Sequence, residues 1–117
     1  MAEFGTEISV AGYTFRGDLT IEEARRLAKA LVECIGMTPS HPLHVFEYLA
    51  VDGKPSPGFI VVQCIIESLI AIDVWPQLHA FYVHAVSCKE FSEEAVTVFM
   101  RNRGFEQRSV FGGYLST

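Results

Sequence analysis

The sequence predicts an α+β fold, a two-layer sandwich in which one antiparallel sheet carries two helices on one face. The predicted order of elements is strand, helix, several strands, helix, strand. Each helical pattern begins at a capping residue, and the extended segments are short, apolar and separated by turn residues. With 117 residues the chain has room for one domain, which we expect to cover residues 1–117.

The first strand and the first helix are expected within residues 6–36. The alternating pattern of Ile8, Val10, Gly12 and Thr14 favours a strand over 6–15, and a turn is expected at Arg16-Gly17-Asp18. Thr20 and Glu23 form a T-x-x-E capping box at the start of a helix, and Gly36 is placed to end it. The apolar face of this helix has the 3.6-residue spacing of Ala24, Leu27, Ala28, Leu31, Cys34 and Ile35.

The rest of the chain alternates strands with turns before a second helix. Strands are expected over 44–51, 59–66, 69–74 and 79–86, and the last of these leads to Cys88. Residues 59–66 are near-continuously apolar, as in a strand that is covered on both faces or buried centrally. Ser92 caps the second helix, acids occupy its first turn, and Gly104 ends it. Its buried stripe is predicted to be Ala95, Val98 and Phe99. A final strand is expected over 105–111.

Composition narrows the class of function. Half of the residues are hydrophobic and 20% are charged, which excludes disorder. A net charge of -5 argues against a nucleic-acid partner or an anionic membrane surface. The longest apolar run, 65–74, is broken by polar residues and is too short to span a bilayer. A domain this short buries only part of the surface that its unfolded chain exposes, so we expect at least a homodimer.

The cysteines and the N-terminus indicate a cytoplasmic protein. Cys34, Cys64 and Cys88 are odd in number and widely spaced, which favours reduced thiols over a disulfide framework. The first residues lack the basic-then-apolar pattern of a signal peptide.

Metal and nucleotide sites are not predicted. His41 and His44 are three residues apart, and His79 and His84 are five apart. An odd separation on a strand directs two side chains to opposite faces, so neither pair is suited to hold a metal ion. The sequence contains no GxGxxG, Walker or GxSxG motif.

One segment carries a resemblance to a known family. Residues 67–76 read ESLIAIDVWP, and Cys88 follows Ser68 by twenty residues. This resembles the core of the prokaryotic-type S-adenosylmethionine decarboxylases, E-S-H-(I/L)-x-I-H-T-W-P, with a cysteine at the same distance. The matching residues are Glu67, Ser68, Ile70, Ile72, Trp75, Pro76 and Cys88. The length and the order of elements also agree.

The resemblance implies a pyruvoyl-dependent enzyme that processes itself. Ser68 would be the precursor of the pyruvoyl cofactor, and its hydroxyl would attack the carbonyl of Glu67, so that the chain is cut between the two. The pyruvoyl group would then act as the electron sink that decarboxylation of an α-amino acid requires. Cys88 would protonate the substrate carbon after carbon dioxide leaves; from the residues alone the favoured interpretation is a core thiol at a strand end.

The resemblance also implies a substrate-binding set. Trp75 would lie against the adenine, and a flat aromatic ring also suits a sulfonium cation. Phe46 or Tyr48 would supply a second ring, and Gln77 stands where the family has an acidic residue that contacts the ribose. Trp75 alone would also fit as a buried aromatic residue beside a proline turn.

Three positions depart from the family pattern. Leu69 stands where the family has a histidine directly after the serine, and Asp73 stands where it has the histidine that assists processing. Gln77 replaces the family's ribose-binding acidic residue. A partly buried Asp73 could act as a base or as a structural hydrogen-bond acceptor.

These residues lead to three hypotheses. The first is a decarboxylase of S-adenosylmethionine in polyamine (spermidine) synthesis, with catalytic Ser68, Cys88, Glu67 and Asp73. The second is an uncleaved, non-catalytic relative that binds a small ligand or a partner subunit, without a cofactor. The third is an oligomeric α+β module with an unrelated ligand.

Overall fold

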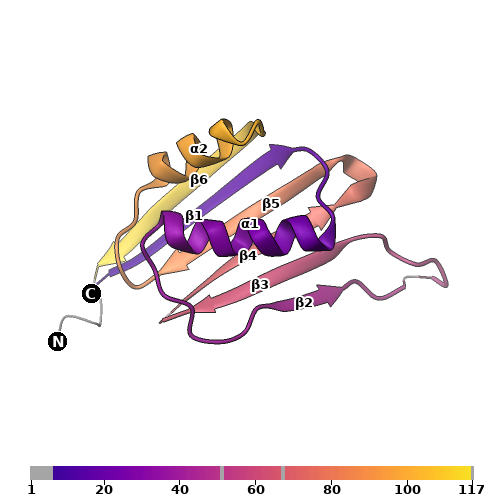
Figure 1. The fold of residues 1–117 in the computed structure, drawn as a ribbon, viewed down its shortest axis with the longest axis horizontal. Helices are drawn as coiled ribbons and strands as arrows, with labels where there is room; N and C mark the ends of the chain where they lie inside the picture. The colour runs from indigo at the N-terminus through magenta and orange to yellow at the C-terminus, as the bar shows by residue number, and fades with distance from the viewer. Residues whose placement is uncertain (1–6, 51, 67, 117) are drawn as a thin grey trace.

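The computed structural model describes residues 7–50, 52–66 and 68–116, which form a sheet and a layer of helices (Figure 1). The elements in chain order are β1 (Glu7–Arg16), α1 (Ile21–Cys34), β2 (His44–Glu47), β3 (Phe59–Ile65), β4 (Ser68–Trp75), the 3-10 turn η1 (Pro76–Leu78), β5 (Ala80–Ser87), α2 (Glu93–Asn102) and β6 (Glu106–Ser116).

The six strands form one sheet in the order β2-β3-β4-β5-β1-β6. Every pairing is antiparallel. β3, β4 and β5 are successive hairpin neighbours, whereas β1 lies between β5 and β6. The structure therefore joins the N-terminal strand to the last two strands of the chain.

Both helices cover the same face of the sheet (Figure 1). α1 begins at the predicted capping box: Thr20 Oγ1 accepts from the Glu23 N–H, and Glu23 Oε1 accepts from the Thr20 N–H. Gly36 follows the helix with a φ of 71°, a backbone conformation that glycine adopts without a Cβ penalty. The predicted start and end of this helix are confirmed.

The core lies between the helices and the sheet. It contains odd-numbered residues of β1, β3 and β5, and even-numbered residues of β4, as the period of two requires. Phe15 and Phe81 stack with ring centroids 5.3 Å apart, and Phe105 meets Phe81 edge-on at 5.1 Å. The sheet side of the core is thus strongly aromatic near β1 and β5.

The α+β two-layer prediction is confirmed, with four corrections to its elements. The buried residues of α2 are Val96 and Met100, whereas Val98 of the predicted stripe is 39% exposed. The buried residues differ from the predicted ones because contacts with β6 and α1 determine which side of α2 faces the sheet. The local spacing of apolar residues does not reveal these contacts.

The other three corrections concern strands. β2 ends at Glu47, earlier than the predicted 44–51, and β6 runs to Ser116, beyond the predicted 105–111. β6 is longer because β1 gives it a partner along its whole length. β3 is buried on alternate residues rather than on both faces.

The face of the sheet away from the helices is named here the open face. In the described part of the chain no helix covers it (Figure 1). It carries several half-buried or exposed apolar side chains: Ile8, Val10, Ile60, Val62, Leu69 and Val86. The predicted site lies along this open face and at one end of the sheet.

Candidate functional site

Ser68 is the first residue of β4, directly after the turn that joins β3 to β4. In the hairpin Ile65 pairs with Ser68, so only two residues connect the strands. The turn is held from outside, since the Ile66 N–H donates to the Thr38 carbonyl at 3.0 Å and Pro39 forms a bridge with Ile65. Glu67, which is predicted to supply the carbonyl that Ser68 attacks, lies outside the described residues.

Cys88 lies at the same end of the sheet as Ser68. Leu69 pairs with Val86 across β4 and β5, and continuing that register places Ser68 opposite Ser87 and Cys88 one residue beyond. Cys88 is half-buried. Ser87 is buried, and its hydroxyl accepts from the Lys89 N–H at 3.0 Å, which fixes the chain as it leaves β5.

Asp73 and Trp75 lie toward the other end of β4. Five residues separate Ser68 from Asp73, which is about 17 Å along a strand. Asp73 pairs with Ile60 and with Tyr82, so it is on the open face near the middle of the sheet. Within one chain, the structure does not bring Asp73 together with Ser68.

Tyr48 binds Asp73 directly. Its hydroxyl donates to Asp73 Oδ1 and is also hydrogen-bonded to the Trp75 side chain. Burial, and then the hydrogen bond and charge of Asp73, raise the pKa of Tyr48 to about 12. The side chains of Tyr48, Asp73 and Trp75 thus form a cluster. The sequence predicts Tyr48 only as an alternative to Phe46 for the second aromatic ring of the substrate site.

Gly58 allows Tyr48 to take this position. The Tyr48 N–H donates to the Gly58 carbonyl at 3.1 Å, and a Cβ on Gly58 would lie 2.8 Å from the tyrosine ring. Only a residue without a side chain leaves room for the ring there.

Phe46 and Gln77 are the remaining predicted substrate-binding residues. Phe46 pairs with Ile60, which in turn pairs with Asp73, so Phe46 and Asp73 stand in one row across the open face. Phe46 is 55% exposed. Gln77 is exposed in η1, beyond Trp75.

Two further side chains of the open face were not singled out as site residues from the sequence. Tyr82 and His84 lie on β5, with ring centroids 4.0 Å apart. Burial lowers the pKa of His84, and the charge of Asp73 acts in the opposite direction. The spacing of two between Tyr82 and His84 within the predicted strand 79–86 was a signal that the two share one face, and the pairing of Tyr82 with Asp73 shows that this is the face of Asp73.

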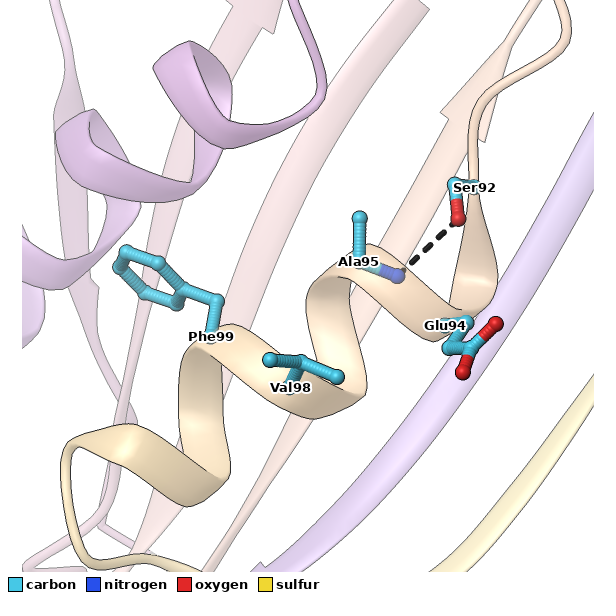
Figure 2. Close-up of a pocket in the computed structure, with 5 residues that line it drawn as sticks. All are labelled: Ser92, Glu94, Ala95, Val98 and Phe99. Atoms are coloured by element: carbon cyan, nitrogen blue, oxygen red, sulfur yellow. Dashed lines mark hydrogen bonds between the residues drawn. The ribbon is translucent and has the colours of Figure 1, made fainter.

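The hollow beside α2 lies in the helix layer (Figure 2). It is lined by Ser92, Glu94, Ala95, Val98 and Phe99. Ser92 Oγ accepts from the Ala95 N–H at 3.0 Å, which is a helix cap. Glu94 is its one charged side chain, so the hollow has no acid–base pair.

The described part of the chain has neither a metal-binding cluster nor a membrane-spanning helix. Within residues 7–50, 52–66 and 68–116, no three side chains of His, Cys, Asp or Glu are grouped to hold a metal ion. In the same part of the chain no helix is both long and apolar enough to cross a membrane. The three cysteines form no disulfide bonds.

The fold and these residues define a class of protein: a two-layer α+β domain with polar and aromatic groups on the uncovered side of an antiparallel sheet. The model of the S-adenosylmethionine decarboxylase family matches residues 18–110. The chain therefore belongs to the S-adenosylmethionine decarboxylase family.

A solved structure agrees with this assignment. The crystal structure of the adenosylmethionine decarboxylase from Aquifex aeolicus is similar, with a TM-score of 0.67 and 16% sequence identity. The match covers 97% of this chain and 91% of that chain. At this identity the likeness concerns the fold. No curated protein matches the sequence.

Proposed function

We propose that this protein is a pyruvoyl-dependent decarboxylase of S-adenosylmethionine that works in polyamine (spermidine) synthesis in the cytoplasm. The observation that carries the proposal is the common position of Ser68, which begins β4, and Cys88, which directly follows the neighbouring strand β5, at one end of the sheet. Membership of the family supports the decarboxylase reaction and the substrate.

The residues around Ser68 suit the formation of a pyruvoyl group. Ser68 is half-buried beside a two-residue turn, and the carbonyl that its hydroxyl would attack belongs to the residue directly before it in the chain. The Thr38 carbonyl anchors this turn by accepting from the Ile66 N–H. Once formed, the pyruvoyl group would supply the electron sink for loss of carbon dioxide.

Cys88 would deliver the proton that replaces the lost carboxyl group. It stands beside the turn, half-buried, where it is partly shielded from water. The aromatic side chains of Trp75 and Phe46 would bind the adenine and the sulfonium, and Gln77 would contact the ribose.

The separation of these groups along β4 favours a homodimer. Ser68 and Cys88 lie at one end of the sheet, while Asp73 and Trp75 lie about 17 Å away toward the other end. Two copies that pack their open faces together, related by a two-fold axis, would bring the Ser68 end of one onto the Asp73 end of the other. The apolar open face would be covered in the same step.

Intact-mass analysis of the denatured protein tests the proposal. The expected result is two fragments, 1–67 and 68–117, with the second blocked at its first residue by pyruvoyl. Ser68→Ala should give one uncut chain of the same fold. A wild-type chain that stays at 13.0 kDa after long incubation would exclude the proposal.

One observation favours the alternative of an uncleaved relative that binds a ligand or partner subunit. Tyr48 donates to Asp73, so this carboxylate is engaged in a structural bond rather than left open as a base. In this alternative S-adenosylmethionine would raise the melting temperature without any release of carbon dioxide.

A further inference from the structure

A second hollow lies between α1 and the chain that follows it, over the helix-facing side of β3. After α1 the chain turns back and runs toward β2 in the opposite direction (Figure 1). Residues of α1 line the hollow on one side and residues 39–43 on the other, and its volume is about 470 Å³. Sites for small molecules usually measure about 300–1,000 Å³. This space, named here the α1 hollow, is on the helix side of the sheet, away from the open face.

Gln63 forms the floor of the α1 hollow. It lies in the helix-facing row of β3 between the buried residues Val61 and Ile65, and only 3% of it is exposed. A buried amide is costly unless it is hydrogen-bonded, and its Nε2 donates to the His41 carbonyl at 2.8 Å and to the Cys64 carbonyl at 2.9 Å. An amide nitrogen has two hydrogens, so both are used within the chain. The group that Gln63 can offer to a ligand is therefore its carbonyl oxygen.

The wall opposite α1 is held in place by β3. Pro39 forms a bridge with β3, and the Ser40 N–H donates to the Cys64 carbonyl at 3.0 Å. The bond from Gln63 holds the residue that follows Ser40. Pro39 and Pro42 stiffen the segment further, because the proline ring fixes φ. A wall that is already ordered lowers the cost of binding a ligand.

The α1 wall carries charges of both signs in one line. Arg25, Lys29 and Glu33 follow one another at intervals of four residues, which places their side chains on one side of the helix. Arg25 has a loose ion pair with Glu22, at 3.8 Å from its Nε. Among the residues that the structure describes, no ion pair includes Lys29 or Glu33. A lysine that precedes a glutamate by four residues is the less favourable order for a pair along a helix, so both charges are available to a ligand.

The two signs lie toward opposite ends of the hollow. The helical rise places Lys29 and Glu33 about 6 Å apart along the axis, with Arg25 about 6 Å farther on the side of Lys29. Val32 and Leu43 also line the hollow, and both pack on the core. The α1 hollow thus has a cationic end, an acidic end and an apolar surface.

We propose that the α1 hollow binds a small zwitterion, an amino acid whose carboxylate and ammonium groups are separated by a short apolar chain. Arg25 and Lys29 bind the carboxylate, and Glu33 and the Gln63 carbonyl oxygen accept from the ammonium. An ammonium group only donates hydrogen bonds, and both of these partners are acceptors. The opposite charges on α1 are about one helical turn apart, farther than the two charged groups of an α-amino acid. The inference goes beyond the proposed function and does not depend on it.

The first test titrates the full-length protein with 5-aminopentanoate and follows it by NMR. The expected result is a saturable shift of the backbone amide resonances of residues 39–43 and of the Gln63 side-chain amide. Pentanoate and pentylamine each lack one charged end and should bind about tenfold more weakly, the effect of losing one hydrogen bond to a charged group. If pentanoate binds as tightly as 5-aminopentanoate, the acidic end is not used and the inference fails.

Charge removal on α1 locates the site. Lys29→Gln and Glu33→Gln should each raise the dissociation constant for 5-aminopentanoate about tenfold. Both side chains are exposed, so the fold should be retained. Lys54→Gln is the matched control, because it removes the same charge from an exposed position between β2 and β3, and it should leave the constant unchanged. Equal weakening in Lys29→Gln and Lys54→Gln would indicate a general effect of net charge and would overturn the site.

The result can be separated from that of the proposed function. The uncut Ser68→Ala chain should bind 5-aminopentanoate as tightly as the wild type, since Ser68 does not line the hollow. A chain that never cleaves but binds the amino acid would exclude the proposed function and leave this inference standing. A chain that cleaves but shows no saturable shift at residues 39–43 would overturn this inference alone.

Discussion

Cys88 is one of three cysteines in the chain, and it alone stands twenty residues after Ser68, the spacing of the family motif. It follows β5 at the Ser68 end of the sheet; Cys64 on β3 pairs with Leu69 at the same end, and Cys34 lies on α1. Cys34 donates to the Ala95 carbonyl at 3.7 Å between the two helices, and burial raises its pKa. A role in the reaction is therefore proposed for Cys88 alone.

Substitution of Cys88 tests that role. Cys88→Ala should still be cut at residue 67 but should lose decarboxylation about 10²-fold, because it removes only the proton donor. Release of labelled carbon dioxide, measured on the cleaved protein, checks this. Cys64→Ala is the control and should retain both activities; equal losses in the two variants would contradict the assignment.

Tyr48 gives a prediction about pH. Its folded pKa is raised from 10.0 to about 12, so the folded chain holds this proton more tightly than the unfolded chain. The resulting contribution to stability is complete below pH 10 and is lost as the pH rises toward 12. We expect Tyr48→Phe to lose less stability between pH 10 and 12 than the wild type, measured by urea unfolding. An identical decline in both would contradict it.

At the scale of residues, the sequence identified the motif but not the cluster around Asp73. Ser68, Trp75 and Cys88 could be selected because they fall within one short motif and at one fixed spacing. The bond from Tyr48 depends on the loop after β2 returning over β4, a contact between residues 25 positions apart. Local patterns carry no information about such contacts.

Among the elements, α2 shows where periodicity misleads. Its apolar residues include both a sheet-facing set and a solvent-facing set, so two stripes are possible on a helix of ten residues. The packing against β6 and α1 selects Val96 and Met100. The order of elements was predictable because capping and turn residues are local; the order of strands in the sheet was not.

Paired substitutions in α2 check the corrected face. Met100→Ala should lower the free energy of unfolding by about 2–5 kcal/mol, because Met100 is fully buried and its loss leaves a cavity. Val98→Ala should change it by less than about 0.5 kcal/mol, since this side chain is partly exposed. Chemical unfolding gives both values. A larger loss of unfolding free energy for Val98→Ala than for Met100→Ala would favour the buried face predicted from the sequence.

For the whole molecule, the open face predicts the state of assembly. Val62 lies on β3, half-buried, opposite Ala71 near the centre of this face. Val62→Glu should convert a dimer to a monomer, because a charge would be buried without a partner in the packed sheets. Light scattering after gel filtration measures the mass.

The control for this prediction lies in the helix layer. Val98→Glu adds the same charge to α2, on the side of the molecule away from the open face, and should remain dimeric. A wild-type monomer, or a dimer unaffected by Val62→Glu, would exclude the face-to-face arrangement.

The strand order has a consequence for a chain that has been cut. Residues before the proposed cleavage site supply β1, β2 and β3, and those after it supply β4, β5 and β6. Because β1 is inserted between β5 and β6, and β3 pairs with β4, the two fragments share the ladder at three separate borders. The cut protein would behave as a tightly interlaced pair of peptides that migrates as one particle until a denaturant parts them.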